Sequence, residues 1–322
     1  MKKITKWVAY SIIALVLIAI IVSSYIVLAL PNVGKPEDIK IALTPQRIAR
    51  GAYLANHVDM CMDCHSERDW SKPIGPVTAD KLGAGGDIFD AGDGYPGTVQ
   101  IPNITPYKLK SWTDGEILRA LTEGVRKDGS AIFPLMPWPN FAKMSREDLY
   151  SVIAYLRSIK PIATPPYQAR KLDFPLNVLV HTMPQKVTAF EQKPSPADTV
   201  KYGAYIINAA ACDGCHSQHI HGAIPPELEF AGGVEFKIGT KTFLSANITP
   251  DKNTGIGNWT SQEFVQLFKL HTDSARAANP NAKIATSVMP FYDYSGMTET
   301  DLKAIYAYLR TVKPVHNKVA SE

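Results

Sequence analysis

The chain has 322 residues, 45% of them hydrophobic and 20% charged, so it can bury a core and is neither disordered nor collagen-like. Its 34 basic and 30 acidic residues give a net charge of +4. Three of the bases are Lys2, Lys3 and Lys6, so the rest of the chain is close to neutral and lacks the basic surface of a nucleic-acid-binding protein.

Residues 7–30 carry no charge and follow a short lysine-rich tail, residues 1–6. As a helix this stretch would be about 36 Å long, against about 30 Å for the hydrocarbon core of a bilayer, which predicts a transmembrane anchor. The alternative is a cleaved signal peptide with Val22 and Ser24 at the recognition site. Apolar residues continue from there to Leu30, which favours a retained anchor. The leading lysines predict a cytoplasmic tail and an exported body.

Residues 46–160 and 199–314 carry the same landmarks in the same order, which predicts two tandem domains of about 115 residues each. A linker of residues 31–45 precedes the first, a proline-rich linker of residues 161–198 joins the two, and residues 315–322 form a tail. The paired landmarks are Gly51–His65 with Gly203–His216, Asn103–Pro106 with Asn247–Pro250, Trp112 with Trp259, Leu135–Trp138 with Val288–Phe291, and Ile153–Pro161 with Ile305–Pro314.

Helical signals lie at both ends of each unit. Residues 45–60 and 198–211 are predicted helices that run into the first cysteine of each unit, Cys61 and Cys212. The sequences Ser145–Asp148 and Thr298–Asp301 resemble capping boxes, in which the cap hydroxyl and a carboxylate three residues later both bind free backbone N–H groups. Apolar residues then recur at helical spacing up to a Lys-Pro pair. The middle of each unit shows no alternating strand pattern, so the predicted fold is mostly α.

The sequence Cys-x-x-Cys-His, present in both units, is the attachment signature of c-type heme. Two thiols one helical turn apart can each bond to a vinyl group of the porphyrin, and the adjacent histidine can bind the iron. A structural zinc site would have to bridge the long gap from Cys64 to Cys212, and two disulfides would leave the histidines without a role. We therefore predict two covalently bound heme c groups, attached at Cys61, Cys64, Cys212 and Cys215, with His65 and His216 as axial ligands.

Two equivalent pairs of methionines are candidates for the second axial position. Met144 and Met297 directly precede helix caps, where they suit a hydrophobic contact with the helix. Met136 and Met289 lie in loops before a proline that keeps the backbone extended, so we predict that these two bind iron. The alternative is that they are ordinary core methionines. His/Met ligation closes both axial positions and suits electron transfer, so no catalytic residue is expected.

These motifs resemble those of class I c-type cytochromes, and more closely those of the multi-heme cytochrome c subunits of bacterial membrane-bound dehydrogenases for alcohols, sugar acids and aldehydes. The resemblance implies the same heme ligands, and crossed N- and C-terminal helices in each domain with Gly51 and Gly203 at the crossing. There are two departures. Those subunits typically carry three domains, and residues 276–286 replace the Gly-Val-x-x-Asp-Gly stretch of the first unit (Gly124–Gly129) with a longer loop.

The expected architecture is a transmembrane helix followed by two tandem class I cytochrome c domains on the periplasmic side of a bacterial inner membrane. The expected function is electron transfer between a dehydrogenase or quinol-oxidising complex and a downstream acceptor such as a terminal oxidase. Two alternatives stay open. A diheme cytochrome c peroxidase would need one iron able to open to peroxide, and a diheme subunit of a heme-copper oxidase complex would also be anchored.

Overall fold

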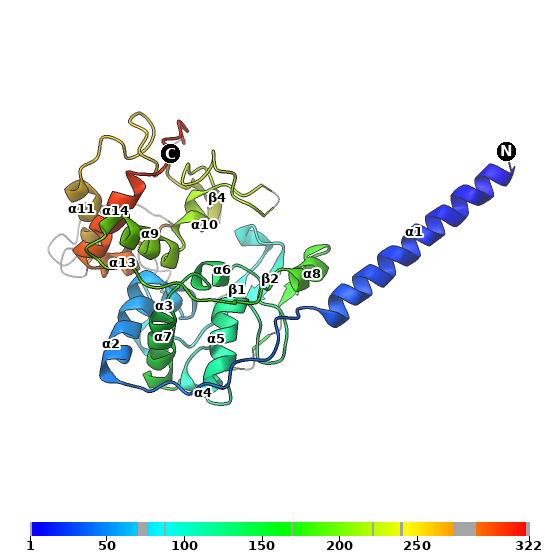
Figure 1. Ribbon diagram of the computed structural model, residues 1–322, viewed down its shortest axis with the longest axis horizontal. Helices are drawn as coiled ribbons and strands as arrows, with labels where there is room; N and C mark the ends of the chain where they lie inside the picture. Colours follow the sequence, from blue (N-terminus) through cyan, green and yellow to red (C-terminus); the bar gives the residue numbers. More distant parts are fainter. Residues whose placement is uncertain are drawn as a thin grey trace.

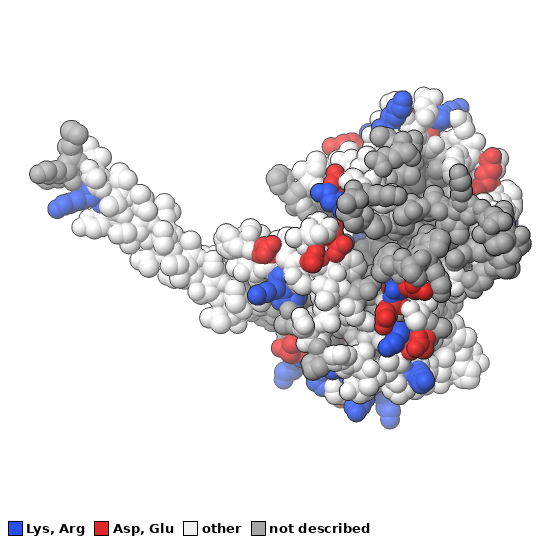
Figure 2. Space-filling model, turned by 180° about the vertical axis from the view of Figure 1, so that it is seen from behind, with Lys and Arg blue, Asp and Glu red and all other residues white. Residues whose placement is uncertain are grey.

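A computed structural model describes residues 2–69, 76–86, 88–165, 167–168, 170–220, 222–238, 241–272 and 288–319. The chain is mostly helical, and a long helix, α1 (Lys2–Ala29), stands away from the body (Figure 1). Residues Ile4–Ala29 of α1 are apolar and long enough to cross a membrane. Along this helix, Figure 2 shows basic side chains only near the free end. Large apolar side chains are exposed along α1, so it needs an apolar environment that the body does not supply.

The first unit is framed by two crossed helices. Helix α2 (Pro45–Tyr53) begins at Thr44, whose hydroxyl accepts a hydrogen bond from the N–H of Arg47, and continues into a π-helical turn (Leu54–Val58). It packs across α7 (Arg146–Ser158). A Cβ atom on Gly51 would lie 1.8 Å from the carbonyl oxygen of Ser151, so only glycine permits this approach.

The second unit repeats this arrangement. Helix α9 (Thr199–Ala209) packs across α14 (Glu299–Leu309), and a Cβ on Gly203 would lie 1.9 Å from the carbonyl oxygen of Ala304. Both crossings agree with the resemblance. The other helices are α3 (Cys61–Cys64), α4 (Pro106–Leu109), α5 (Asp114–Glu123), α6 (Trp138–Phe141), α8 (Leu176–Leu179), α10 (Cys212–His216), α11 (Ser261–Lys269) and α13 (Phe291–Ser295), with 3-10 turns at Ala79–Lys81, Ala91–Asp93 and Val180–Thr182.

The loops between the helices contain short strands that the sequence analysis did not expect. Strands β1 (Ile88–Phe89), β2 (Gly97–Gln100) and β3 (Lys171–Leu172) form an antiparallel sheet in that order. Strands β4 (Glu235–Ile238) and β5 (Lys241–Leu244) form a hairpin with Phe236 opposite Phe243. Strands of two to four residues are too short to show a period of two, so the sequence pattern did not reveal them.

The proline-rich segment between the units packs against the body. It supplies β3, helix α8 and the 3-10 turn Val180–Thr182, and Glu191 forms a bridge with Ser145. The segment therefore forms part of the wall of the first unit as well as joining the two units.

The capping boxes expected at α7 and α14 are half formed. The hydroxyls of Ser145 and Thr298 do accept hydrogen bonds from the N–H groups of Asp148 and Asp301. The carboxylates do not bond back to the cap N–H groups, so this part of the prediction is wrong. Tyrosines from the opposite unit bind those N–H groups instead.

This exchange is reciprocal. The N–H of Ser145 donates to the hydroxyl of Tyr205 at 3.1 Å, and that hydroxyl donates to Asp148 at 2.9 Å. In the other direction the N–H of Thr298 donates to Tyr53 at 3.0 Å, and Tyr53 donates to Asp301. Each unit therefore caps the C-terminal helix of the other unit.

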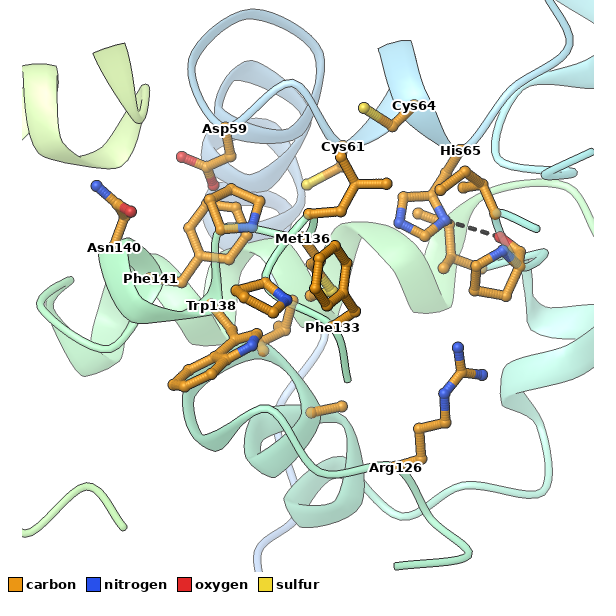
Figure 3. A pocket seen from close by; sticks show the side chains of 18 of the residues that line it. Asp59, Cys61, Cys64, His65, Arg126, Phe133, Met136, Trp138, Asn140 and Phe141 are labelled. Carbon is orange, nitrogen blue, oxygen red and sulfur yellow. Dashed lines mark hydrogen bonds between the residues drawn. The ribbon is translucent and has the colours of Figure 1, made fainter. Parts of the chain in front are cut away.

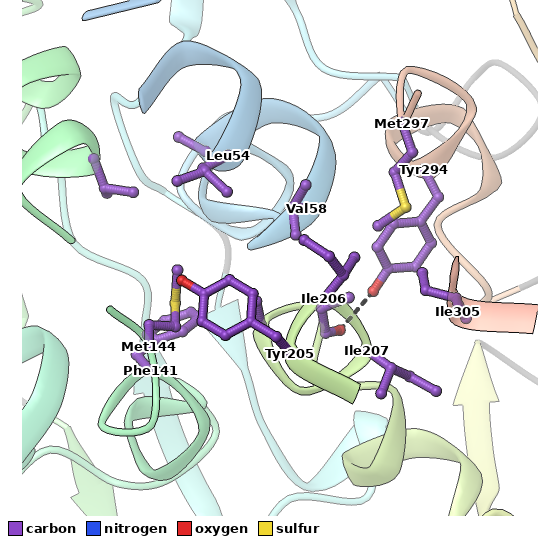
Figure 4. Close-up of a cluster of buried hydrophobic side chains, with 14 of the residues drawn as sticks. Leu54, Val58, Phe141, Met144, Tyr205, Ile206, Ile207, Tyr294, Met297 and Ile305 are labelled. Atoms are coloured by element: carbon purple, nitrogen blue, oxygen red, sulfur yellow. Dashed lines mark hydrogen bonds between the residues drawn. The ribbon is translucent and has the colours of Figure 1, made fainter. Parts of the chain in front are cut away.

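A single hydrophobic core runs through both units (Figure 4). Leu54, Val58 and Met144 from the first unit belong to the same buried cluster as Ile206 and Met297 from the second. Met144 and Met297 are 0% and 1% exposed, which agrees with the packing role predicted for them.

Substituting the crossing glycines tests the helix frame. We expect Gly203→Ala and Gly51→Ala each to lower the free energy of unfolding by about 3 kcal/mol, because the added Cβ meets backbone that must move. Gly214→Ala is the matched control, since its Cβ meets nothing within 4 Å. Urea unfolding followed by circular dichroism measures the difference, and equal losses in all three variants would contradict the close crossing.

The tyrosine exchange is tested with Tyr53→Phe and Tyr205→Phe. Each should lower the free energy of unfolding by about 1–2 kcal/mol, because a backbone N–H and a buried carboxylate lose the hydroxyl that they share. Tyr306→Phe is the control, since its hydroxyl bonds to the carbonyl of Trp259 at an exposed position, and its effect should be within about 0.5 kcal/mol. If all three variants behave alike in the same unfolding assay, the exchange does not stabilise the fold.

Candidate functional site

The first Cys-x-x-Cys-His motif borders a cavity of about 1930 Å³ (Figure 3). Cys61 and Cys64 reach it from α3, His65 follows directly, and Met136 enters from the loop before α6. Ordinary small-molecule pockets have about 300–1,000 Å³, so this space suits a large rigid group. The structure thus brings the four predicted residues of the first site together around one cavity.

Each motif begins at a sharp turn in the chain. Met60 and Ala211, which precede the first cysteines, have φ of 51° and 49°, in the left-handed region. The helical turns α3 and α10 start there and place the two cysteines of each motif one turn apart. The turn separates each motif from the helix before it.

A backbone carbonyl orients the histidine of each motif in the same way. Nδ1 of His65 donates to the carbonyl oxygen of Pro102 at 2.7 Å, and Nδ1 of His216 donates to that of Ala246 at 2.8 Å. Nε2 is thereby left as the basic nitrogen, which a metal ion can bind. Burial lowers the pKa of His65 to about 4 and also lowers the pKa of His216, so both rings are neutral, as metal ligation requires.

The repeated Asn-Ile-Thr-Pro sequences hold these carbonyls in place. The side-chain oxygen of Asn103 accepts a hydrogen bond from the N–H of Thr105, and its amide group donates to the carbonyl of Ile162. Asn247 does the same with Thr249 and Val315. Both asparagines are buried, so they tie the loop that carries the histidine's partner to the segment after the C-terminal helix.

The predicted methionine of the second site is less fully described. Met289 is half-buried, directly before Pro290 and α13, and packs against the core. The neighbouring residues 273–287, which include the longer loop at residues 276–286, lie outside the described part of the chain.

The second motif borders the cavity of the first. Asp213, Gly214 and Cys215 line it, and the amide of Asn140 in α6 donates to Asp213 at 2.9 Å. Tyr95 also lines the cavity, and burial, with smaller contributions from the neighbouring Cys215 and Cys64, raises its pKa to about 12. The two motifs therefore lie close to each other, with Tyr95 beside both.

Arg126 is a cavity residue to which the sequence analysis gave no role. Its guanidinium donates to the hydroxyl of Tyr167 at 2.8 Å, lies 4.7 Å from the centre of that ring, and helps to lower the pKa of His65. Arg126 belongs to the Gly124–Gly129 stretch, which is one of the stretches that resemble the cytochrome c subunits. That resemblance was the signal in the sequence that could have identified Arg126 as a residue of the site. Its positive charge suits the carboxylates that a heme carries.

Asp59 also lines the cavity without having been predicted. It is 7% exposed, and its Oδ1 has no hydrogen-bond partner among the described residues. Burial raises its pKa to about 8. Nothing in the local sequence distinguishes this aspartate, because its burial depends on tertiary packing.

The residues of the first site fit a covalently attached heme. The cavity presents two thiols one helical turn apart, a neutral imidazole with a free Nε2, a thioether and a guanidinium. Thiols and imidazole could equally hold zinc, but among the described residues no cluster of three or more His, Cys, Asp or Glu has the geometry of a metal site.

Comparison with known proteins agrees with this chemistry. The sequence model of the cytochrome c family matches residues 200–313. The chain is 28% identical over 287 residues to the cytochrome c subunit of an alcohol dehydrogenase (quinone) from Gluconacetobacter polyoxogenes, which covers 83% of this chain and 56% of that protein. It is 30% identical over 278 residues to a fructose dehydrogenase cytochrome subunit from Gluconobacter japonicus, covering 82% of this chain and 52% of that one.

A diheme cytochrome c-type protein from Cereibacter sphaeroides is 24% identical over 271 residues, which cover 79% of this chain and 82% of that protein. By contrast, the chain spans only about half the length of the dehydrogenase subunits. The resemblance drawn from the motifs is confirmed by these matches.

Asp59 should make stability depend on pH. Its pKa in the folded protein lies above the ordinary value of 3.8, so its contribution to stability falls as the pH rises from about 4 to about 8. Asp59→Asn should therefore lose less stability than the parent between pH 5 and pH 8. Urea unfolding at both pH values measures this, with Asp38→Asn, an exposed position, as control. Parallel losses in parent and Asp59→Asn would contradict the assignment.

Proposed function

Because the chain contains a cytochrome c domain and is similar to cytochrome c subunits of dehydrogenases, we propose that it is a membrane-anchored diheme c-type cytochrome that transfers electrons. The observation that carries the proposal is the repetition of one complete arrangement. In both units a Cys-x-x-Cys-His motif follows a left-handed turn, and the Nδ1 of its histidine is held by a carbonyl beside a buried asparagine.

We propose tandem class I cytochrome c domains at residues 46–160 and 199–314, with one heme c in each. The first would be attached at Cys61 and Cys64 and bound through His65 and Met136. The second would be attached at Cys212 and Cys215 and bound through His216 and Met289. Nδ1 of each histidine forms the same hydrogen bond to a backbone carbonyl, which supports the same role for both histidines. A heme with both axial positions closed accepts and releases one electron at a time.

The arrangement of the two units supports transfer from one site to the other within the chain. Cys64 and Cys215 line one cavity, and Asn140 bonds directly to Asp213 across the boundary between the units. The shared core and the exchanged tyrosines keep this spacing constant. Electrons can therefore pass between the sites without movement of one unit relative to the other.

The partners follow from the relatives and from α1. The relatives are named as subunits of alcohol and fructose dehydrogenases, so we propose a dehydrogenase or a quinol-oxidising complex as donor, and a membrane-bound acceptor such as a terminal oxidase. Helix α1 would be retained as an anchor in the bacterial inner membrane. Its leading lysines would stay in the cytoplasm and the body would face the periplasm.

Heme content and ligand substitution test the proposal. The purified protein should contain two hemes per chain by pyridine hemochrome assay, both low-spin. Met136→Ala should convert one of them to a high-spin species and remove half of the methionine–iron absorption band, because it deletes one axial ligand. Met144→Leu, at the other methionine that has an equivalent in the second unit but is fully buried, should leave the spectrum unchanged.

Two results would contradict it. One heme per chain would rule out a second site, and loss of the methionine–iron band in Met144→Leu but not in Met136→Ala would reverse the ligand assignment. A high-spin heme that turns over peroxide in the unsubstituted protein would indicate a peroxidase instead.

A further inference from the structure

A small structural element lies where α1 meets the body. Helix α8 and the 3-10 turn Val180–Thr182 contact α1 (Figure 1). Nδ1 of His181 donates a hydrogen bond to the carbonyl oxygen of Leu30, directly after the last turn of α1. The segment from Phe174 to Thr182 is therefore fixed at the base of the long helix.

This segment exposes apolar side chains at that position. Phe174 is 81% exposed, the highest value for any large apolar side chain among the described residues outside α1, and Leu179 is 43% exposed. Val180, the next residue after Leu179, is fully buried. The segment therefore has one side packed on the body and one side exposed to solvent. Lys171 and Asp173, with opposite charges, directly precede the segment, and the segment itself contains no Lys, Arg, Asp or Glu.

The length of α1 sets the depth at which this surface lies. The stretch Ile4–Ala29, in which Lys6 is the only charged residue, has 26 residues and is about 39 Å long as a helix. The hydrocarbon core is about 30 Å thick, and the bilayer with its headgroups about 40–45 Å. The last turn of a spanning α1 therefore reaches the headgroup region, and residues that touch this turn from outside lie at the same depth. Phe and Leu are among the side chains by which interfacial segments enter this region.

We propose that Phe174 and Leu179 form a membrane-contact surface that inserts into the headgroup region of the bilayer spanned by α1. This inference rests on the proposed anchoring. A single helix would leave the body free to tilt, whereas a second contact beside the helix fixes its orientation. Burial of an exposed apolar side chain at the interface provides the driving force.

The orientation has a consequence for the first site. The residues that follow the 3-10 turn, among them Met183, Lys186 and Val187, line the cavity of the first site. The chain thus runs directly from the membrane-contact surface into the wall of that cavity. Helix α1 leaves the body beside α8, and the second unit is stacked on the first (Figure 1). The proposed membrane-contact surface is therefore joined directly, along the chain, to the wall of the first site.

The test measures membrane depth on the full-length holoprotein in phosphatidylcholine–phosphatidylglycerol vesicles. A nitroxide is attached at Asn177→Cys, an exposed position of α8, and its accessibility to oxygen is compared with that to a water-soluble nickel chelate. Val16→Cys, in the middle of α1, reports the anchor, and Leu270→Cys, 64% exposed on the second unit, is the aqueous control. The protein without added cysteine should take up no label.

We expect an oxygen-to-nickel accessibility ratio at Asn177→Cys several-fold above that at Leu270→Cys, and a fall to the control value when Phe174→Asp is added. A buried label at Val16→Cys together with an aqueous one at Asn177→Cys would overturn the inference while leaving the anchor intact. An aqueous label at Val16→Cys would overturn the anchoring itself. An unchanged ratio in Phe174→Asp would show that Phe174 does not hold the surface in the membrane.

Discussion

The exchange of tyrosine hydroxyls between the two units is the interaction on which the rest of the structure depends. Tyr53 and Tyr205 each bind a backbone N–H and a carboxylate at the start of the opposite unit's C-terminal helix. Burial, with the neighbouring carboxylates, raises the pKa of both phenols, so they stay protonated and donate. An unpaired buried carboxylate would cost about 1–3 kcal/mol. Asp148 also binds Arg50, and Asp301 also binds Tyr202, so each helix end is completed by both units together.

The same constraint fixes the two candidate sites relative to each other. Tyr53 and Tyr205 lie on the helices that run into α3 and α10, so holding these residues also holds the cysteine motifs. The contact between Asn140 and Asp213, and the cavity shared with Cys215, follow from this docking. A chain with a flexible connection between its units would present two separate sites, whereas this one presents two sites at a constant distance.

Within each site, buried polar side chains hold loops in place by hydrogen bonds. Asn103 and Asn247 close their loops with one side chain each, and the carbonyl before each asparagine orients a histidine. Asp59 differs because one of its carboxyl oxygens has no partner among the described residues. A buried carboxyl of this kind is costly to ionise, so burial raises its pKa to about 8 and the group beside the cysteines is mostly protonated at neutral pH.

The sequence by itself determined whatever depends on local spacing. Examples are the apolar length of α1, the Cys-x-x-Cys-His motifs, the duplicated landmarks and the hydroxyl caps at Ser145 and Thr298. Tertiary structure alone decided the partner of each cap N–H, the isolation of Asp59, the role of Arg126, the short strands and the packing of the linker. These features join residues far apart in the chain, such as Tyr53 and Thr298. Local periodicity does not encode such contacts, because they form only when both units bury one common core.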